Sequence, residues 1–154
     1  MTAAPQGSRR RPAYLRPALL LTVAAGGSVG TLTRALLAAA FPPAPGGWPW
    51  VTFGVNVTGA FLLGLVLQAL ALRGPDEGAR RLTRLALGTG VLGGYTTYST
   101  FAVETAALGR DGEVVLATAY DAASLLAGLV AAWLGVLLAE ALPQRASGPD
   151  AGRR

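Results

Sequence analysis

The sequence predicts an all-α membrane protein with four transmembrane helices and a break in the third. Of its 154 residues, 52% are hydrophobic and 14% are charged, whereas a soluble domain usually carries about 25% charged residues. The hydrophobic residues gather in four runs, and each run has the length of about 20 residues that crosses a bilayer. The third run contains GTGVLGGYTTYSTF at 88–101, whose glycine and β-branched residues lower helix propensity.

The first two spans are expected at 18–41 and 51–72, after a polar arm at 1–17. The loop between these spans contains four prolines and two glycines, which exclude a helix there. Trp48 and Trp50 at its end are typical of the membrane interface, where amphipathic rings prefer to lie.

The third span is expected at 85–103, after a charged connection at 73–84. A short turn at 108–112 then leads to the fourth span at 114–139, which is interrupted only by Asp121. Irregular backbone at membrane depth is stable only when it is buried in protein or lines a polar path. We therefore expect the broken third helix to present backbone carbonyls and hydroxyls to an ion.

The arginines predict the topology of the four-helix domain, 18–140. The arm, the charged connection and the polar tail at 141–154 share one side and hold eleven of the 13 arginines, and the other two are Arg34 and Arg110. Because arginine-rich loops stay in the cytoplasm, we expect a multi-pass protein of the cell membrane with both termini cytoplasmic. This placement accounts for the basic character of the chain without nucleic acid binding.

The composition also excludes several kinds of chemistry. The chain has neither cysteine nor histidine, which excludes disulfides, thiol chemistry and histidine acid–base catalysis. Neither a catalytic dyad nor a nucleotide-binding loop is visible, so we expect no enzymatic activity.

Three charged residues, Arg34, Glu104 and Asp121, are expected at similar depth toward the non-cytoplasmic ends of their helices. Because an unpaired charge inside a membrane is costly, we expect Glu104 or Asp121 to neutralise Arg34; the alternative is that Arg34 extends to the interface. In the same stretch, GGSVGTLTR, the spacing of Gly26 and Gly30 predicts the close approach of another helix.

Polar side chains form stripes on the second and fourth helices. Asn56, with Thr52 one turn earlier, brings an amide into a segment that holds almost nothing else polar. This amide could hold helices together or donate hydrogen bonds to a desolvated anion. Tyr120, Ser124 and Gly128 are each four residues apart and share one helix face, and the two hydroxyls predict a polar track.

Together these stretches resemble the CrcB/Fluc family of fluoride channels. The resemblance covers about 26–135 and rests on GGSVGTLTR, TFGVNVTG, GGYTTYSTF with Glu104 shortly after, and Tyr-x3-Ser-x3-Gly, in this order. It implies antiparallel dimers with two fluoride pores at the subunit interface. It also implies a structural Na⁺ ion at the dimer centre, which is not transported and is held by backbone carbonyls of the helix-three breaks.

The resemblance also implies roles for single residues. Gly93 and Thr96 match the positions whose carbonyls hold the sodium, and Arg34 matches the arginine of the family's first helix. Tyr98 and Phe101 match the aromatic pair whose ring edges face fluoride. With Thr52 from the second-helix stripe, the expected ion pathway comprises Asn56, Tyr98, Phe101, Tyr120 and Ser124.

Two features depart from the family pattern. Tyr98 stands where a phenylalanine is usual; its ring keeps an electropositive edge, but its hydroxyl adds bulk and a donor. The arginine bias is also unlike the nearly balanced loop charges of family members that insert in both orientations as homodimers. We therefore hypothesise that this chain inserts one way and pairs with an oppositely oriented paralogue, with self-association as the alternative.

The expected function is passive export of fluoride, which lowers its toxicity. Fluoride is small and strongly hydrated, so a pore must replace its water with hydrogen-bond donors, whereas a full positive charge would bind it too tightly for release. One alternative is a non-conducting partner subunit of a heterodimeric channel, which Tyr98 would suit. Another is a small proton-coupled multidrug exporter, which needs a carboxylate in the first helix, where this chain has Arg34.

Overall fold

The computed structural model describes residues 16–143, so most of the expected arm and tail lie outside the described residues. Within this range the chain is helical and contains no strand, which confirms the predicted all-α class. Three helices are long and apolar enough to cross a membrane: α1 (Pro17–Ala40), α2 (Trp50–Ala71) and α6 (Val114–Ala141). The chain is therefore a multi-pass membrane protein.

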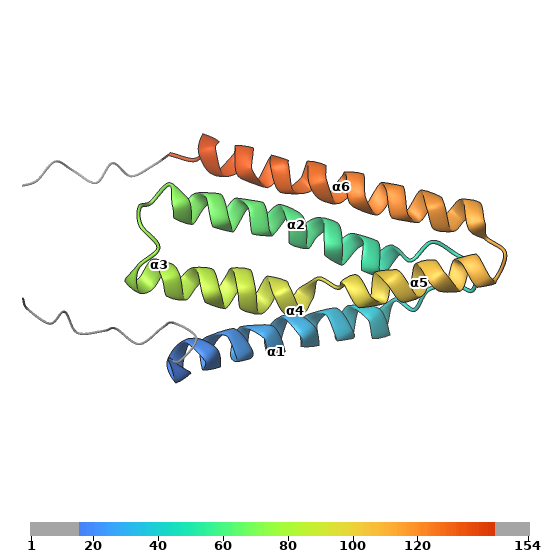
Figure 1. Ribbon diagram of the computed structural model, residues 1–154, viewed down its shortest axis with the longest axis horizontal. Coiled ribbons are helices and arrows are strands. Elements are labelled where there is room, and N and C mark those ends of the chain that lie inside the picture. Colours follow the sequence, from blue (N-terminus) through green and yellow to red (C-terminus); the bar gives the residue numbers. More distant parts are fainter. Residues whose placement is uncertain (1–15, 144–154) are drawn as a thin grey trace, which may run out of the picture.

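The remaining helical residues form a row of four shorter segments. Helix α2 lies between this row and α6, and α1 packs along the opposite side of the row (Figure 1). The start of α1 and the end of α6 lie at the same end of the molecule (Figure 1). The row consists of α3 (Gly78–Thr83), the π-helix η2 (Arg84–Leu92), α4 (Gly93–Tyr95) and α5 (Tyr98–Arg110).

This row differs from the predicted third span at both ends. Helical structure already begins at Gly78, inside the expected charged connection, and it continues to Arg110, through most of the expected turn at 108–112. The helix continues to Arg110 because Asp111 and Gly112 are enough to make the turn. The φ of Gly112 is +84°, a conformation that favours glycine.

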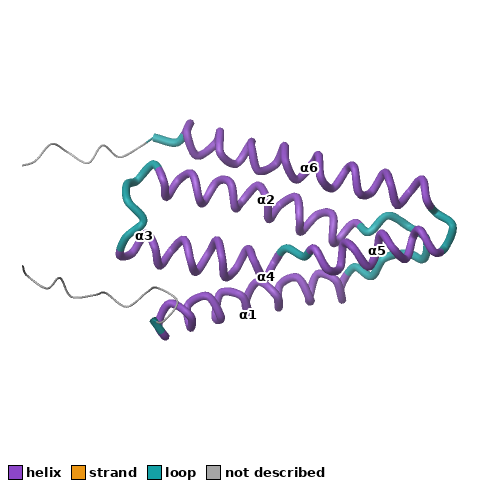
Figure 2. Tube along the Cα trace, in the orientation of Figure 1, coloured by secondary structure: helices purple, strands orange, loops and turns teal. Residues whose placement is uncertain are grey.

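The row is interrupted by two residues of extended backbone, Thr96 (φ −78°, ψ 158°) and Thr97 (φ −147°, ψ 124°). Figure 2 shows them as a loop between two helical segments. Gly93 and Gly94 remain helical, so the glycines do not themselves form the interruption. Helix α5 restarts because the Thr97 hydroxyl accepts a hydrogen bond from the Thr100 N–H at 3.1 Å, as an N-cap does.

The prediction that Gly26 and Gly30 let another helix approach closely is confirmed. A Cβ at Gly26 would lie 2.5 Å from the Ala86 carbonyl oxygen, and one at Gly30 would collide with the Val91 carbonyl oxygen. Both neighbours belong to η2, so the backbones of α1 and η2 are in direct contact. Nine residues of π-helix are unusual, since most π segments are single turns.

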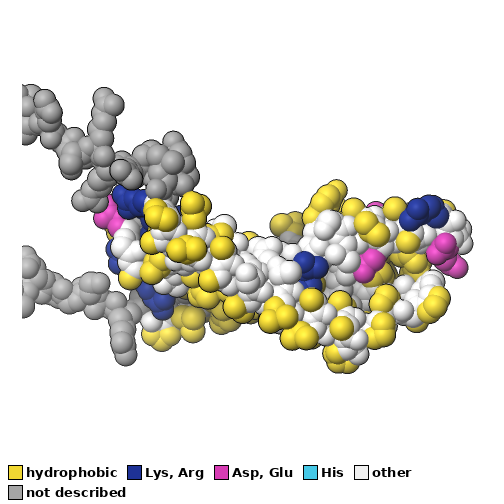
Figure 3. All heavy atoms as spheres, turned by 90° about the horizontal axis from the view of Figure 1, so that it is seen from below, with side chains coloured by type: hydrophobic (Ala, Val, Ile, Leu, Met, Phe, Trp, Pro, Cys, Tyr) yellow, Lys and Arg dark blue, Asp and Glu magenta, His cyan; other side chains and the backbone are white. Residues whose placement is uncertain are grey.

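Large apolar side chains cover much of the outer surface, as expected for a protein surrounded by lipid. Leu21, Leu125 and Leu129 are each 69–70% exposed, and Figure 3 shows hydrophobic side chains distributed along the molecule with charged ones gathered mainly near its ends.

Replacing Gly30 by alanine should destabilise the protein by about 1–3 kcal/mol, the usual cost of overpacking. The added methyl would meet backbone atoms, with the Tyr95 nitrogen 2.7 Å away, and backbone cannot yield as a side chain can. Thermal unfolding in detergent would measure the loss. Gly54→Ala, where no atom lies within 4 Å of the added Cβ, is the control; an equal loss there would contradict the packing account.

Candidate functional site

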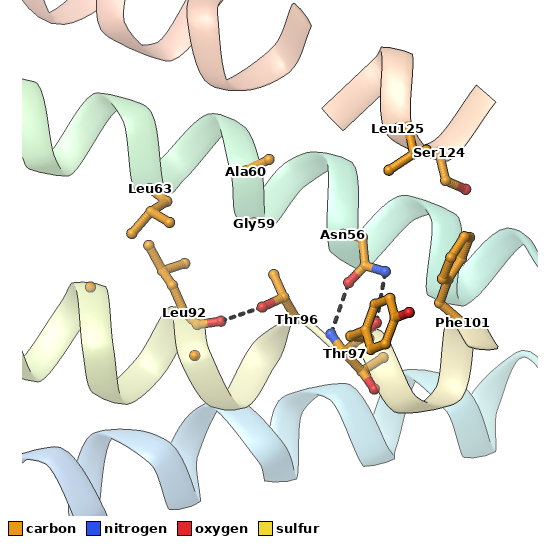
Figure 4. A pocket seen from close by; sticks show the side chains of 13 residues that line it. Asn56, Gly59, Ala60, Leu63, Leu92, Thr96, Thr97, Phe101, Ser124 and Leu125 are labelled. Carbon is orange, nitrogen blue, oxygen red and sulfur yellow. Dashed lines mark hydrogen bonds between the residues drawn. The ribbon is translucent and has the colours of Figure 1, made fainter. Parts of the chain in front are cut away.

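A groove of about 390 Å³ runs beside the interruption of the helical row, between α2, α5 and α6. Its walls contain the Asn56 amide, the Ser124 hydroxyl and the ring of Phe101 (Figure 4). The ring of Tyr98 also lines it. The groove thus brings together six of the sequence-predicted site residues: Asn56, Gly93, Thr96, Tyr98, Phe101 and Ser124.

Asn56 holds the interruption open. Its Nδ2 donates to the Thr97 carbonyl oxygen at 2.9 Å, and its Oδ1 accepts from the Thr97 N–H at 2.8 Å (Figure 4). In a continuous helix this N–H would bond to the Gly93 carbonyl. Of the two uses that the sequence left open for Asn56, the single chain shows the one that joins helices. One N–H of the amide is left over for the groove.

The carbonyls around the interruption fall into two groups. The Leu92 carbonyl accepts from the N–H and the hydroxyl of Thr96, at 3.0 and 2.9 Å, and the Gly94 carbonyl accepts from helix α1. The carbonyls of Gly93, Tyr95 and Thr96 receive no hydrogen bond from residues 16–143. Helix α2 approaches this region at Gly59, where a Cβ would collide with the Thr96 methyl group.

The prediction that Glu104 or Asp121 neutralises Arg34 is wrong for the single chain. Arg34 Nε instead donates to the Gly94 carbonyl oxygen at 3.3 Å, beside the Thr31 hydroxyl at 3.4 Å. Carbonyls at the C-terminal end of a helix lack partners and carry partial negative charge, so the interruption itself supplies a site for the guanidinium. The ion pairs within 16–143 lie elsewhere, at Asp76.

Glu104 lies at the centre of a hydroxyl cluster. The Thr52 hydroxyl donates to Oε1 at 2.8 Å and the Tyr120 hydroxyl to Oε2 at 2.9 Å. Asp121 similarly accepts from the Thr105 hydroxyl, and its Oδ1 is 2.6 Å from that donor. Glu104 and Thr52 also line a second cavity of about 470 Å³ next to the 41–50 segment. The sequence analysis considered Glu104 only as a charge that could pair with Arg34. Its expected depth, similar to that of Tyr120, could have indicated the contact between these two residues.

Aromatic rings connect the groove with this cluster. The centroids of Tyr98 and Phe101 are 6.1 Å apart, and those of Phe101 and Tyr120 are 5.1 Å apart. Tyr98 is 81% exposed, whereas Tyr120 is fully buried. Ser124 Oγ is buried in the wall of the groove and has no hydrogen-bond partner within the described chain. Such orphaned groups are rare in folded proteins, so Ser124 can serve a polar ligand.

Comparison with known proteins identifies the family of this arrangement. The family model described as "CrcB-like protein, Camphor Resistance (CrcB)" matches residues 21–136. The chain belongs to the CrcB family. The matched residues include every side chain of the groove and of the Glu104 cluster, so the CrcB resemblance inferred from the motifs is confirmed.

Curated CrcB-family relatives cover most of the chain. A protein of Leifsonia xyli subsp. xyli, named fluoride-specific ion channel FluC 2, is 48% identical over 131 residues, which are 85% of this chain and 90% of the relative. The fluoride-specific ion channel FluC 1 of Cutibacterium acnes is 44% identical over 119 residues, 77% and 83% of the two chains. The fluoride-specific ion channel FluC of Chlorobium luteolum is 40% identical over 127 residues, which are 80% of this chain and 94% of the relative.

Proposed function

We propose that this chain is a subunit of a fluoride channel that lets fluoride leave the cytoplasm passively and so lowers its toxicity. The groove is the observation that carries the proposal. It offers an amide, a hydroxyl and aromatic edges, and its described lining contains no charged side chain. Such a path can replace the water around a small anion without holding the ion too tightly. The names of the relatives support fluoride as that anion.

We infer that the row from α3 to α5 also crosses the membrane, as the third of four crossings in chain order. This crossing is made of two pieces that meet at Thr96 and Thr97. Packing against α1 on one side and against α2 and α6 on the other supports this. The polar backbone of the interruption would then lie at membrane depth, where it must be covered by protein or line a polar path.

An antiparallel dimer would complete the groove. Tyr98, a wall residue, is 81% exposed in the single chain, and a second subunit could cover it and close the open side. The partner is either a second copy or an oppositely oriented paralogue. The arginine bias favours the paralogue, because a chain with one preferred orientation cannot supply both halves of an antiparallel pair.

A structural sodium ion fits the interruption. Hard cations prefer oxygen ligands, and the carbonyls of Gly93 and Thr96 are among those at the interruption that receive no hydrogen bond from residues 16–143. No cluster of three or more acidic, histidine or cysteine side chains competes as a metal site within 16–143. One chain supplies too few oxygens, so the ion would be shared between subunits and would hold the two interruptions together.

Orientation can be tested on the chain alone. With reporters fused to the C terminus, we expect activity only from the reporter that works in the cytoplasm, because the arginine-rich side is retained there. Equal signals from reporters of both sides would show dual insertion and would remove the reason for a paralogous partner.

Efflux from liposomes tests the proposed activity against its alternatives. Reconstituted protein should release fluoride, measured with a fluoride electrode, at the same rate with and without a proton gradient. Release only when a proton gradient is imposed would indicate an exporter. Release only when the chain is reconstituted together with an oppositely oriented paralogue would indicate a heterodimer that the chain cannot replace by itself.

A further inference from the structure

Four arginines gather where α2 ends and α3 begins, and we call this surface the arginine cap: Arg73, Arg80, Arg81 and Arg84. Figure 3 shows basic side chains gathered at this end of the molecule, and none of them lines the groove. Two carboxylates, Asp76 and Glu77, lie in the same segment, so the cap keeps a net positive charge.

The cap is an ordered structure. Arg84 Nε and Nη2 make a two-pronged contact with the Asp76 carboxylate at 3.0 and 2.8 Å, and Arg81 Nε lies 3.6 Å from the same group. Arg80 Nε donates to the Pro75 carbonyl oxygen at 2.8 Å. The hydrogen bond from Arg84 lowers the pKa of Asp76, which keeps this anchor ionised at neutral pH. These contacts hold the side chains of Arg80, Arg81 and Arg84 in place on the surface.

Most of the guanidinium donors remain available to a ligand. Each guanidinium has five N–H groups, and the contacts of Arg80 and Arg81 use only the Nε side. The side chains of Arg81 and Arg84 are 36% and 38% exposed. Fixed guanidinium groups with free terminal nitrogens suit phosphate oxygens, which they bind in a forked geometry.

The cap follows directly on a membrane-spanning helix, where lipid headgroups are expected. Arg73 follows the end of the membrane-spanning helix α2 by two residues. Leu72 and Leu82 beside it are 38% and 44% exposed, so apolar and basic groups alternate there as they do at an interface. The opposite end of the bundle differs: Arg110 is followed by Asp111 and Glu113, which gives that loop a net negative charge.

We propose that the arginine cap binds the phosphate of an anionic phospholipid in the leaflet at its end of the helices. The lipid is favoured over free phosphate because the membrane already holds it at this depth, next to the exposed leucines. The cap would tie this end of the row, from which η2 leads to the interruption, to the surface of the membrane.

Spin-labelled lipids can test this with the full chain in mixed bilayers. We expect labelled phosphatidylglycerol to associate with the protein more strongly than labelled phosphatidylcholine. Arg73→Gln combined with Arg81→Gln leaves the Arg84–Asp76 and Arg80–Pro75 contacts intact. The double variant should reduce this preference by up to about 25-fold, since each basic residue near a surface contributes about fivefold. Arg110→Gln at the opposite end is the matched control and should change nothing.

Three results would overturn the proposal. They are equal association of the two lipids with the unaltered chain, no loss of preference in the Arg73–Arg81 double variant, and an equal loss in the Arg110 variant. A further measurement distinguishes the lipid headgroup from free phosphate as the ligand. The lipid association is measured again after chloride is replaced by inorganic phosphate at constant ionic strength. The preference for phosphatidylglycerol should survive this exchange. If phosphate abolishes it, the free ion displaces the lipid and is the stronger ligand of the cap, which contradicts the lipid as its occupant in the membrane.

Discussion

Replacing Asn56 by leucine should lower fluoride efflux from liposomes by about 100-fold or more. The substitution removes both hydrogen bonds to Thr97. An interruption that stayed open would then hold one backbone N–H and one carbonyl without partners inside the membrane, at a cost of about 1–3 kcal/mol each. A loss of 2.7 kcal/mol already corresponds to a factor of about 100. The Thr97 N–H would then return to the Gly93 carbonyl, which would close the interruption that the groove requires.

Two further variants separate this role of Asn56 from a general loss of folding. Asn56→Asp keeps an acceptor for the Thr97 N–H but has no donor for its carbonyl, so it should lie between the leucine variant and the unaltered protein. Thr118→Val removes a hydroxyl that bonds only within its own helix and should leave efflux unchanged. If Asn56→Leu conducts within threefold of the unaltered protein, the interruption does not depend on this amide.

Replacing Arg34 by glutamine should lower efflux by about tenfold and destabilise the protein by about 1–2 kcal/mol. A charged hydrogen bond and a cation at a helix C-terminus each contribute on this scale, and Arg34 provides both at the Gly94 carbonyl. Arg34→Lys keeps the charge and should lose less of both quantities. Efflux and thermal unfolding of the two variants would be compared in the same detergent and lipid.

Asp121→Asn decides between the contact seen in the single chain and the ion pair that the sequence predicted. Because Asp121 accepts from Thr105 and not from Arg34, its neutralisation should cost clearly less stability than Arg34→Gln. Equal losses, with no additional loss in the double variant, would show that the two charges act as a pair and would contradict the carbonyl contact.

The positions of residues along each helix could be predicted from the sequence. The apolar runs gave α1, α2 and α6 to within about two residues, the usual uncertainty of helix ends. Glycine spacing in the first helix identified the contact with η2, because only residues without a side chain allow two backbones to approach so closely. The polar run after Gly94 likewise pointed to the region of Thr96 and Thr97, although the glycines proved helical.

The direction in which a side chain points around its helix, and therefore its contacts, could not be predicted from the sequence. The nine π-helical residues of η2 wind with a different period from an α-helix, and two extended residues follow soon after. Both shift the angular position of α5, so Glu104 faces Thr52 and Tyr120 although its depth alone suggested Arg34. Similarly, the sequence showed that Asn56 is polar but not that its amide faces the backbone of Thr97.

A groove that conducts fluoride passively and selectively should carry a fluoride current, and a planar bilayer measures this current directly. With both anions on both sides, in fluoride and chloride gradients of opposite direction, the reconstituted channel, as the chain alone or with a paralogue, should carry current that reverses near the fluoride equilibrium potential. This current should disappear in the Asn56→Leu variant. Current that reverses at the chloride potential, or fluoride current that survives Asn56→Leu undiminished, would contradict the account.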